Sequence, residues 1–144
     1  MIKILFVCHG NICRSPMAEF LMKDLVAKAG RSGEFEIASA AASREEEGNS
    51  VYPAARRELQ KHGIPCGHHT ARRITQADYD HFDHIYYMDG RNARYLRQLL
   101  KDTAKCRPLL SRDVADPWYT GDFTQTWEDL LEGCTRILEE LHDA

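Results

Sequence analysis

A short apolar segment that runs directly into a tight loop and a helix start constrains the fold most. Positions 2 to 7 are apolar except for Lys3, and such a run predicts a strand buried on both faces, as in a central parallel strand. Ser15 is a residue type that caps helices, and Pro16 fits a first helical position. The loop 8–14 therefore lies between a strand and a helix, where open α/β sheets bind their ligands.

The loop 8–14 carries a thiol at its start and a guanidinium at its end. The backbone N–H groups of so short a loop can turn inward and, with the helix N-terminus, bind an anion. Arg14 adds a fork of donors that matches two phosphate oxygens. The same surroundings favour the thiolate form of Cys8. A thiolate beside an oxyanion site is what attack on a phosphate ester requires.

The motif Cys8-x5-Arg14-Ser15 resembles the signature of the low-molecular-weight protein tyrosine phosphatases. A second motif, Asp116-Pro117-Trp118-Tyr119, lies where that family carries its general acid, so the resemblance covers nearly the whole chain. It implies hydrolysis of phosphotyrosine through a phosphocysteine intermediate, with no cofactor. Cys8 is the expected nucleophile, Arg14 the phosphate ligand and Asp116 the general acid. The alternative, a buried Cys8 in an ordinary strand-to-helix turn, leaves the second motif unexplained.

Length and composition agree with one small domain, which we expect to span residues 1–144. The net charge of -3 gives no general attraction to nucleic acid. No apolar run approaches the length of a membrane span, and the N-terminus lacks a signal-peptide layout. Five cysteines without disulfide spacing indicate a reducing cytoplasm. No metal-ligand spacing occurs, so we expect no metal site.

Segments of strand and helix character alternate along the chain, which predicts an α/β fold with a parallel sheet and helices on both faces. Periodicity cannot settle the strand order; the resemblance implies a three-layer, flavodoxin-like fold with four strands in the order 2-1-3-4. Thr75, Asp89 and Asp122 are expected to cap helices. The expected strands are 2–7, 35–39, 84–88 and, at an edge, 107–110. The expected helices are 15–29, 53–62, 75–79, 89–100 and 122–141.

The resemblance implies that the loop residues contact substrate and that a small network supports them. Asn11 tolerates left-handed backbone angles, and the resemblance implies that it forms a buttress with Ser39 and a histidine. His69 matches best, but His68 is adjacent and either could serve. Ser15 can donate a hydrogen bond to the thiolate. The expected substrate-binding residues are His9, Gly10, Asn11, Ile12, Cys13, Ser15, Trp118 and Tyr119.

The second motif supplies an acid because phenolate, whose conjugate acid has a pKa of about 10, is a poor leaving group unless it is protonated as it leaves. Asp116 is preferred over Asp113 because only Asp116 precedes a proline, which restricts its backbone. Trp118 and Tyr119 offer aromatic surface to a phenyl ring. Trp118 stands where the family usually has tyrosine. Glutamates in the segment 44–47 are expected to disfavour acidic peptides.

Several alternatives remain open from the sequence. Cys13 is either a small core residue or a partner for a disulfide with Cys8 under oxidation. Arsenate reductase, which shares the loop, needs further closely spaced cysteines. Protein-arginine phosphatases are also related, but the resemblance implies a threonine there in place of Ile12. A non-enzymatic phosphopeptide-binding module is the last alternative. Expected partners are phosphotyrosine-containing proteins and inorganic phosphate or another oxyanion, bound by a monomer without nucleic acid or membrane.

Overall fold

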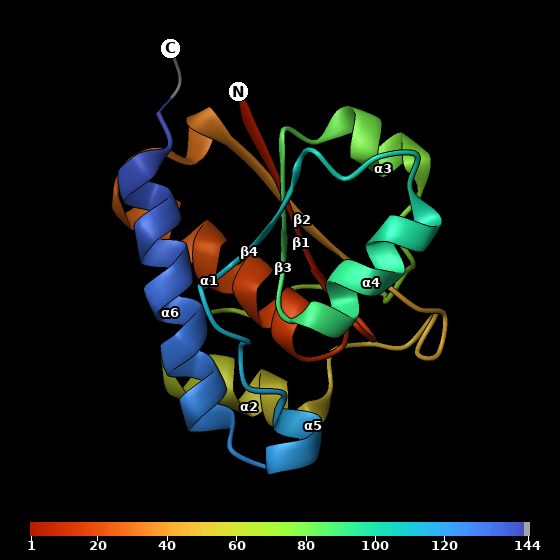
Figure 1. Ribbon diagram of the computed structural model, residues 1–144. Coiled ribbons are helices and arrows are strands. Elements are labelled where there is room, and N and C mark those ends of the chain that lie inside the picture. Colours follow the sequence, from red (N-terminus) through yellow and green to blue (C-terminus); the bar gives the residue numbers. More distant parts are fainter. Residues whose placement is uncertain (143–144) are drawn as a thin grey trace.

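The computed structural model describes residues 1–142 and has a central parallel sheet with helices on both faces (Figure 1). The strand order is β2-β1-β3-β4, and all three pairings are parallel, so the predicted class and order are confirmed. The strands are β1 (Ile2–Cys8), β2 (Phe35–Ala41), β3 (His84–Tyr87) and β4 (Cys106–Pro108). The helices are α1 (Arg14–Lys28), the 3-10 turn η1 (Ser32–Glu34), α2 (Pro53–Lys61), α3 (Gln76–His81), α4 (Gly90–Leu99), α5 (Pro117–Thr120) and α6 (Phe123–Glu140).

Strand β1 lies between β2 and β3 and is buried on both faces, as its apolar run predicts. Ile4 and Phe6 belong to the core shared with α1, α2 and α6. Leu5 and Val7, which alternate with them, belong to a second core on the face covered by α3 and α4. The two cores fix β1 from both sides, and β1 delivers Cys8 to the carboxyl edge of the sheet.

The start of α1 differs from the sequence prediction. Its N-cap is Cys13, with no side-chain cap, so Ser15 and Pro16 lie inside the first turn. Ser15 does not cap because its hydroxyl group points back to Cys8. The predicted caps of α3, α4 and α6 are confirmed, since in each case the cap side chain accepts a hydrogen bond from a backbone N–H in the first turn. These caps are Thr75, Asp89 and Asp122.

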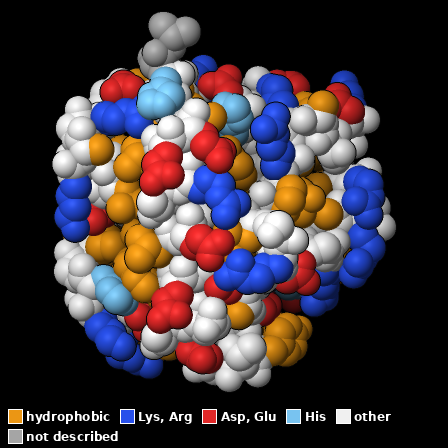
Figure 2. Space-filling model, turned by 60° about the vertical axis from the view of Figure 1, so that its left-hand side comes forward, with side chains coloured by type: hydrophobic (Ala, Val, Ile, Leu, Met, Phe, Trp, Pro, Cys, Tyr) orange, Lys and Arg blue, Asp and Glu red, His pale blue; other side chains and the backbone are white. Residues whose placement is uncertain are grey.

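Helix α6 packs against α1 along the side of the molecule shown in Figure 2, where acidic and basic side chains are interspersed. It also lies close to the segment after β4. A Cβ atom on Gly133 would lie 2.4 Å from Leu109 Cγ, so glycine permits this approach. Within the described residues, no helix has the length and apolar character needed to cross a membrane.

Candidate active site

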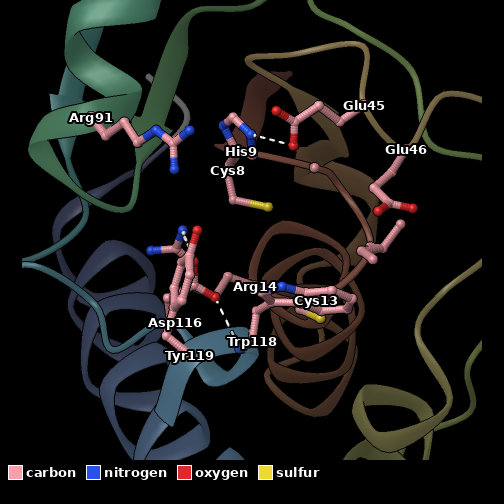
Figure 3. Close-up of a pocket in the computed structure, with 12 residues that line it drawn as sticks. Cys8, His9, Cys13, Arg14, Glu45, Glu46, Arg91, Asp116, Trp118 and Tyr119 are labelled. Carbon is pink, nitrogen blue, oxygen red and sulfur yellow. Dashed lines mark hydrogen bonds and ion pairs between the residues drawn. The ribbon is translucent and has the colours of Figure 1, made fainter. Parts of the chain in front are cut away.

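One pocket at the carboxyl edge of the sheet brings together residues from the loop 8–14, the segment after β2, α4 and α5 (Figure 3). Most of the predicted site residues line it; Asn11, Ser15, Ser39 and His69 lie behind the wall. The lining residues are Cys8, His9, Gly10, Ile12, Cys13, Arg14, Glu45, Glu46, Arg91, Asp116, Trp118 and Tyr119.

The sulfur of Cys8 is surrounded by hydrogen-bond donors. The backbone N–H groups of Asn11 and Ser15 donate to Sγ over 3.3 and 3.4 Å, and Ser15 Oγ lies 3.0 Å from Sγ. Because Asn11 Nδ2 already donates to Ser15 Oγ at 2.7 Å, the hydroxyl proton of Ser15 can point at the sulfur. The sulfur of Cys8 therefore lies among donors that can stabilise negative charge.

Asn11 holds the loop in shape from behind the pocket. Its φ is 61°, a left-handed conformation that asparagine tolerates. Its Nδ2 also donates to Ser39 Oγ at 3.0 Å, and Ser39 Oγ donates to Glu19 Oε1 at 2.6 Å. Its Oδ1 accepts from the backbone N–H of Arg72 at 3.3 Å. Asn11 is fully buried, so this network fixes the curl of the loop.

The structure distinguishes the two candidate histidines. His69 Nε2 lies 2.8 Å from the carbonyl oxygen of Asn11 and donates to it. His68 instead contacts Thr70, at the surface. His69 is therefore the histidine that meets the loop.

Arg14 is buried and paired with carboxylates. Its NH1 donates to Asp89 Oδ2 at 2.8 Å and to the carbonyl of Val114 at 3.1 Å, while NH2 donates to Asp116 Oδ2 at 3.3 Å. Burial opposes its charge, but the nearby Cys8, Asp116 and Asp89 outweigh burial and raise the pKa of Arg14. The guanidinium is thus held at the pocket as a permanent cation.

Asp89 is a site residue that the sequence predicts only as a helix cap. It caps α4 through the N–H of Asn92 and also orients Arg14. Burial raises the pKa of Asp89, but the hydrogen bonds from Asn92 and Arg14 outweigh it, so its pKa lies below the ordinary value. No local pattern marks this second role, because Arg14 lies 75 residues away in the chain.

The two candidate acids occupy different places. Asp116 lines the pocket, caps α5 through the N–H of Trp118 at 3.1 Å, and meets Arg14. Asp113 accepts from the N–H of Gly90 at 3.3 Å and does not line the pocket. The geometry therefore favours Asp116 as the group that can reach a leaving oxygen.

Two side chains of helix α6 hold the segment just before Asp116 by hydrogen bonds to its backbone. The backbone N–H of Ala115 donates to Asp129 Oδ2 at 3.1 Å, and its carbonyl accepts from Thr126 Oγ1 at 2.9 Å. The other oxygen of Asp129 accepts from Arg112 and Gln125, at 2.8 and 2.9 Å. Asp129 is only 3% exposed. This arrangement, which we call the α6 clamp (Ala115, Thr126 and Asp129), has no signal in the sequence.

An aromatic group stands at the mouth of the pocket. Trp118 and Tyr119 are 56% and 74% exposed. The Trp118 ring meets Tyr52 edge to face at 5.3 Å between centroids, and Tyr52 stacks on Phe123 at 6.2 Å. The Trp118 ring is thus supported by Tyr52 and, through it, by Phe123.

Cys13 lies in the pocket wall, 6% exposed and unbonded to another cysteine. Burial, with smaller contributions from Cys8 and Asp116, raises its pKa to about 12. Its thiol is therefore protonated at neutral pH. Cys66, Cys106 and Cys134 lie outside the pocket lining.

Comparison with known proteins agrees with this site. Residues 3–144 match the family model described as low molecular weight phosphotyrosine protein phosphatase. The chain is 37% identical to "Low molecular weight protein-tyrosine-phosphatase YfkJ" of Bacillus subtilis, with 98% of this chain and 96% of the relative covered. It is 34% identical to the human low molecular weight phosphotyrosine protein phosphatase, with 96% and 95% covered.

Solved structures show the same fold. The crystal structure of YfkJ from Bacillus subtilis superposes with a TM-score of 0.92 at 38% identity, covering 96% of this chain and 93% of that one. A drosophila arginine phosphatase, DARP, superposes with a TM-score of 0.85 at 30% identity, covering 99% and 100%. Family model, relatives and fold agree, and the chain belongs to the low molecular weight phosphotyrosine protein phosphatase family.

Proposed function

We propose that this protein hydrolyses phosphotyrosine in protein substrates through a phosphocysteine on Cys8. The observation that carries the proposal is the convergence of three groups in one pocket: Cys8, whose sulfur accepts two backbone N–H groups, and the Arg14–Asp116 pair, 3.3 Å apart. A nucleophile, an oxyanion ligand and an acid are the parts that phosphoryl transfer to a thiol requires.

In the first step, the Cys8 thiolate attacks phosphorus and the bond to the tyrosyl oxygen breaks. Asp116 gives its proton to that oxygen, so a neutral phenol leaves. In the second step, Asp116 takes a proton from water, and the water oxygen displaces sulfur from phosphorus. Phosphate and the thiolate are released. Arg14 and the loop N–H groups bind the phosphoryl oxygens throughout, and we expect the same donors to bind inorganic phosphate or another oxyanion.

The pocket wall supports phosphotyrosine over phosphoarginine as the substrate. Ile12 lines the pocket and Trp118 and Tyr119 flank its mouth, so a flat phenyl ring meets apolar surface. A guanidinium would leave its N–H groups unpaired against Ile12, at a cost of about 1–3 kcal/mol. The drosophila arginine phosphatase with this fold makes phosphoarginine the second candidate. We expect Ile12→Thr to shift the ratio of the two kcat/KM values towards phosphoarginine; an unchanged ratio would count against this role of Ile12.

The remaining alternatives have less support. A thiol relay for arsenate reduction needs a further cysteine at the site, and Cys13 is the only other one in the described pocket lining. A phosphopeptide-binding module would not need Asp116 beside the thiol. The five free cysteines suit a reducing compartment, which supports a cytoplasmic location. We further propose that residues 1–144 act as one domain and as a monomer, because this mechanism draws on residues of one chain.

Turnover of p-nitrophenyl phosphate in the presence of a chelator tests the proposed enzyme. Cys8→Ser should abolish turnover, because a serine hydroxyl does not ionise in this loop, while binding of vanadate or phosphate persists through the backbone donors and Arg14. Isothermal titration with phosphate provides the binding measurement. Turnover of the serine variant near the wild-type rate would refute the mechanism.

A further inference from the structure

Side chains of opposite charge lie on the two sides of the pocket mouth. Arg91, near the start of α4, reaches in from one wall, and Glu45 and Glu46, from the segment after β2, reach in from the opposite wall (Figure 3). The sequence singles out the glutamates, whereas Arg91 has no signal there. A peptide lying across the mouth would meet a cation on one side and two carboxylates on the other.

Arg91 is positioned over the pocket but not neutralised. Hydrogen bonding with the side chains of Tyr95 and Tyr119 raises the pKa of Arg91, and its guanidinium carbon lies 5.9 Å from the centroid of the Tyr95 ring. No carboxylate among residues 1–142 forms an ion pair with it. Arg14, in contrast, is paired with two carboxylates. The charge of Arg91 is therefore available to a bound ligand.

The acidic wall is also fixed by contacts. His9 Nε2 lies 2.8 Å from Glu45 Oε2 and ties that side chain to the catalytic loop. Glu46 accepts from Asn49 Nδ2 at 2.7 Å, and its Cγ packs so close to Gly10 that a Cβ there would lie 3.1 Å away. The Glu45 side chain remains 64% exposed. These contacts therefore hold both carboxylates at this wall.

We propose that Arg91 forms a subsite for an acidic residue adjacent to phosphotyrosine, and that Glu45 and Glu46 repel an acidic residue on the other side. This proposal rests on the proposed phosphotyrosine phosphatase activity. Each charge pair is partly exposed, so we expect an effect of about two- to fivefold in kcat/KM for one acidic residue. The effect should shrink as ionic strength rises, because salt screens exposed charges.

The experiment uses three phosphotyrosine peptides of equal length: a neutral one, one with glutamate directly before the phosphotyrosine and one with glutamate directly after it. For each enzyme, kcat/KM for an acidic peptide is divided by kcat/KM for the neutral peptide, so the amount of active protein cancels. We expect the wild-type ratio to exceed one for one acidic peptide and to fall below one for the other. Arg91→Gln should bring the favourable ratio to about one, and Glu45→Gln should raise the unfavourable ratio.

Two further variants make the test specific. Arg91→Lys should keep most of the preference, because it keeps the charge. Arg97→Gln, which removes a charge from the same helix but outside the pocket lining, should keep the wild-type ratios. Equal wild-type ratios for both acidic peptides, or a preference that survives in Arg91→Gln, would overturn the subsite. Failure of the wild type on every phosphotyrosine peptide would instead overturn the proposed function, so the two failures are distinguishable.

Discussion

Replacing Asp129 with asparagine should weaken general acid catalysis although Asp129 does not touch the substrate pocket. In the α6 clamp, one oxygen of Asp129 accepts from Ala115 and the other from Arg112 and Gln125. An asparagine has one acceptor oxygen, so its NH2 group must face either the Ala115 N–H or the other two donors. If the NH2 group faces Ala115, the segment that carries Asp116 loses a buried backbone hydrogen bond. If it faces the other way, the side chain loses its hydrogen bonds from Arg112 and Gln125, which hold it in place.

The size of the effect follows from those contacts. One buried donor left without a partner costs about 1–3 kcal/mol of stability. If the whole of this free energy is added to the barrier of the step in which Asp116 donates its proton, the rate of that step falls by about 5- to 150-fold. The loss should be large for phenyl phosphate and small for p-nitrophenyl phosphate, because only the more basic leaving group depends strongly on the acid. Thr126→Val, which removes the other half of the clamp at nearly constant shape, should act in the same direction.

The assay is kcat across a series of aryl phosphates of rising leaving-group pKa, with urea unfolding on the same proteins. Glu132→Gln is the matched control, since Glu132 also pairs with Arg112, at 3.4 Å, but has no contact with Ala115. The reasoning fails if Asp129→Asn loses stability but keeps the wild-type dependence on leaving group. It also fails if Glu132→Gln changes that dependence equally.

Three further outcomes are expected from the site. Asp116→Asn should slow aryl phosphate hydrolysis by about 10²–10⁴-fold, and Asp113→Asn should not; the reverse pattern in steady-state kinetics would reassign the acid. Mild peroxide should inactivate the enzyme reversibly with Cys8 joined to Cys13, and mass spectrometry showing only a sulfinic acid at Cys8 would contradict this pairing. Because the pKa of Asp89 is lowered in the folded state, its contribution to stability is complete above its unfolded pKa of about 3.9 and is lost as pH falls through the folded value. Asp89→Asn should therefore flatten the decline of urea-unfolding free energy below about pH 4, and an unchanged decline would contradict this assignment.

Local features of the chain could be predicted well from the sequence. The buried strand β1 depends on residue type and is confirmed, and Asn11 adopts the left-handed backbone angles that its residue type tolerates. The N-cap of α1 was predicted wrongly at Ser15, because a tertiary contact with Cys8 took the hydroxyl away from the helix end. The strand order came from the family resemblance, since periodicity carries no information about which strands are neighbours.

Contacts between segments that are far apart in the chain could not be predicted from the sequence. Asp89 and Arg91 look like an ordinary start of a helix, and their roles at the pocket arise only when α4 is placed beside the loop 8–14. Asp129 looks like a polar residue on a helix until α6 brings it to Ala115. In each case the chemistry depends on the packing of two elements that are far apart in the chain, and no spacing rule describes it.

The placement of α6 has a consequence for the newly synthesised chain. Cys8 leaves the ribosome more than a hundred residues before Asp116, and the clamp on α6 follows later still. Until α6 is made, the face of α1 that it covers has no partner and the segment around Ala115 has no anchor. A nascent chain therefore carries a reactive thiol without a positioned acid. General acid catalysis by Asp116 can therefore begin only after α6 has been translated and has packed against the segment around Ala115.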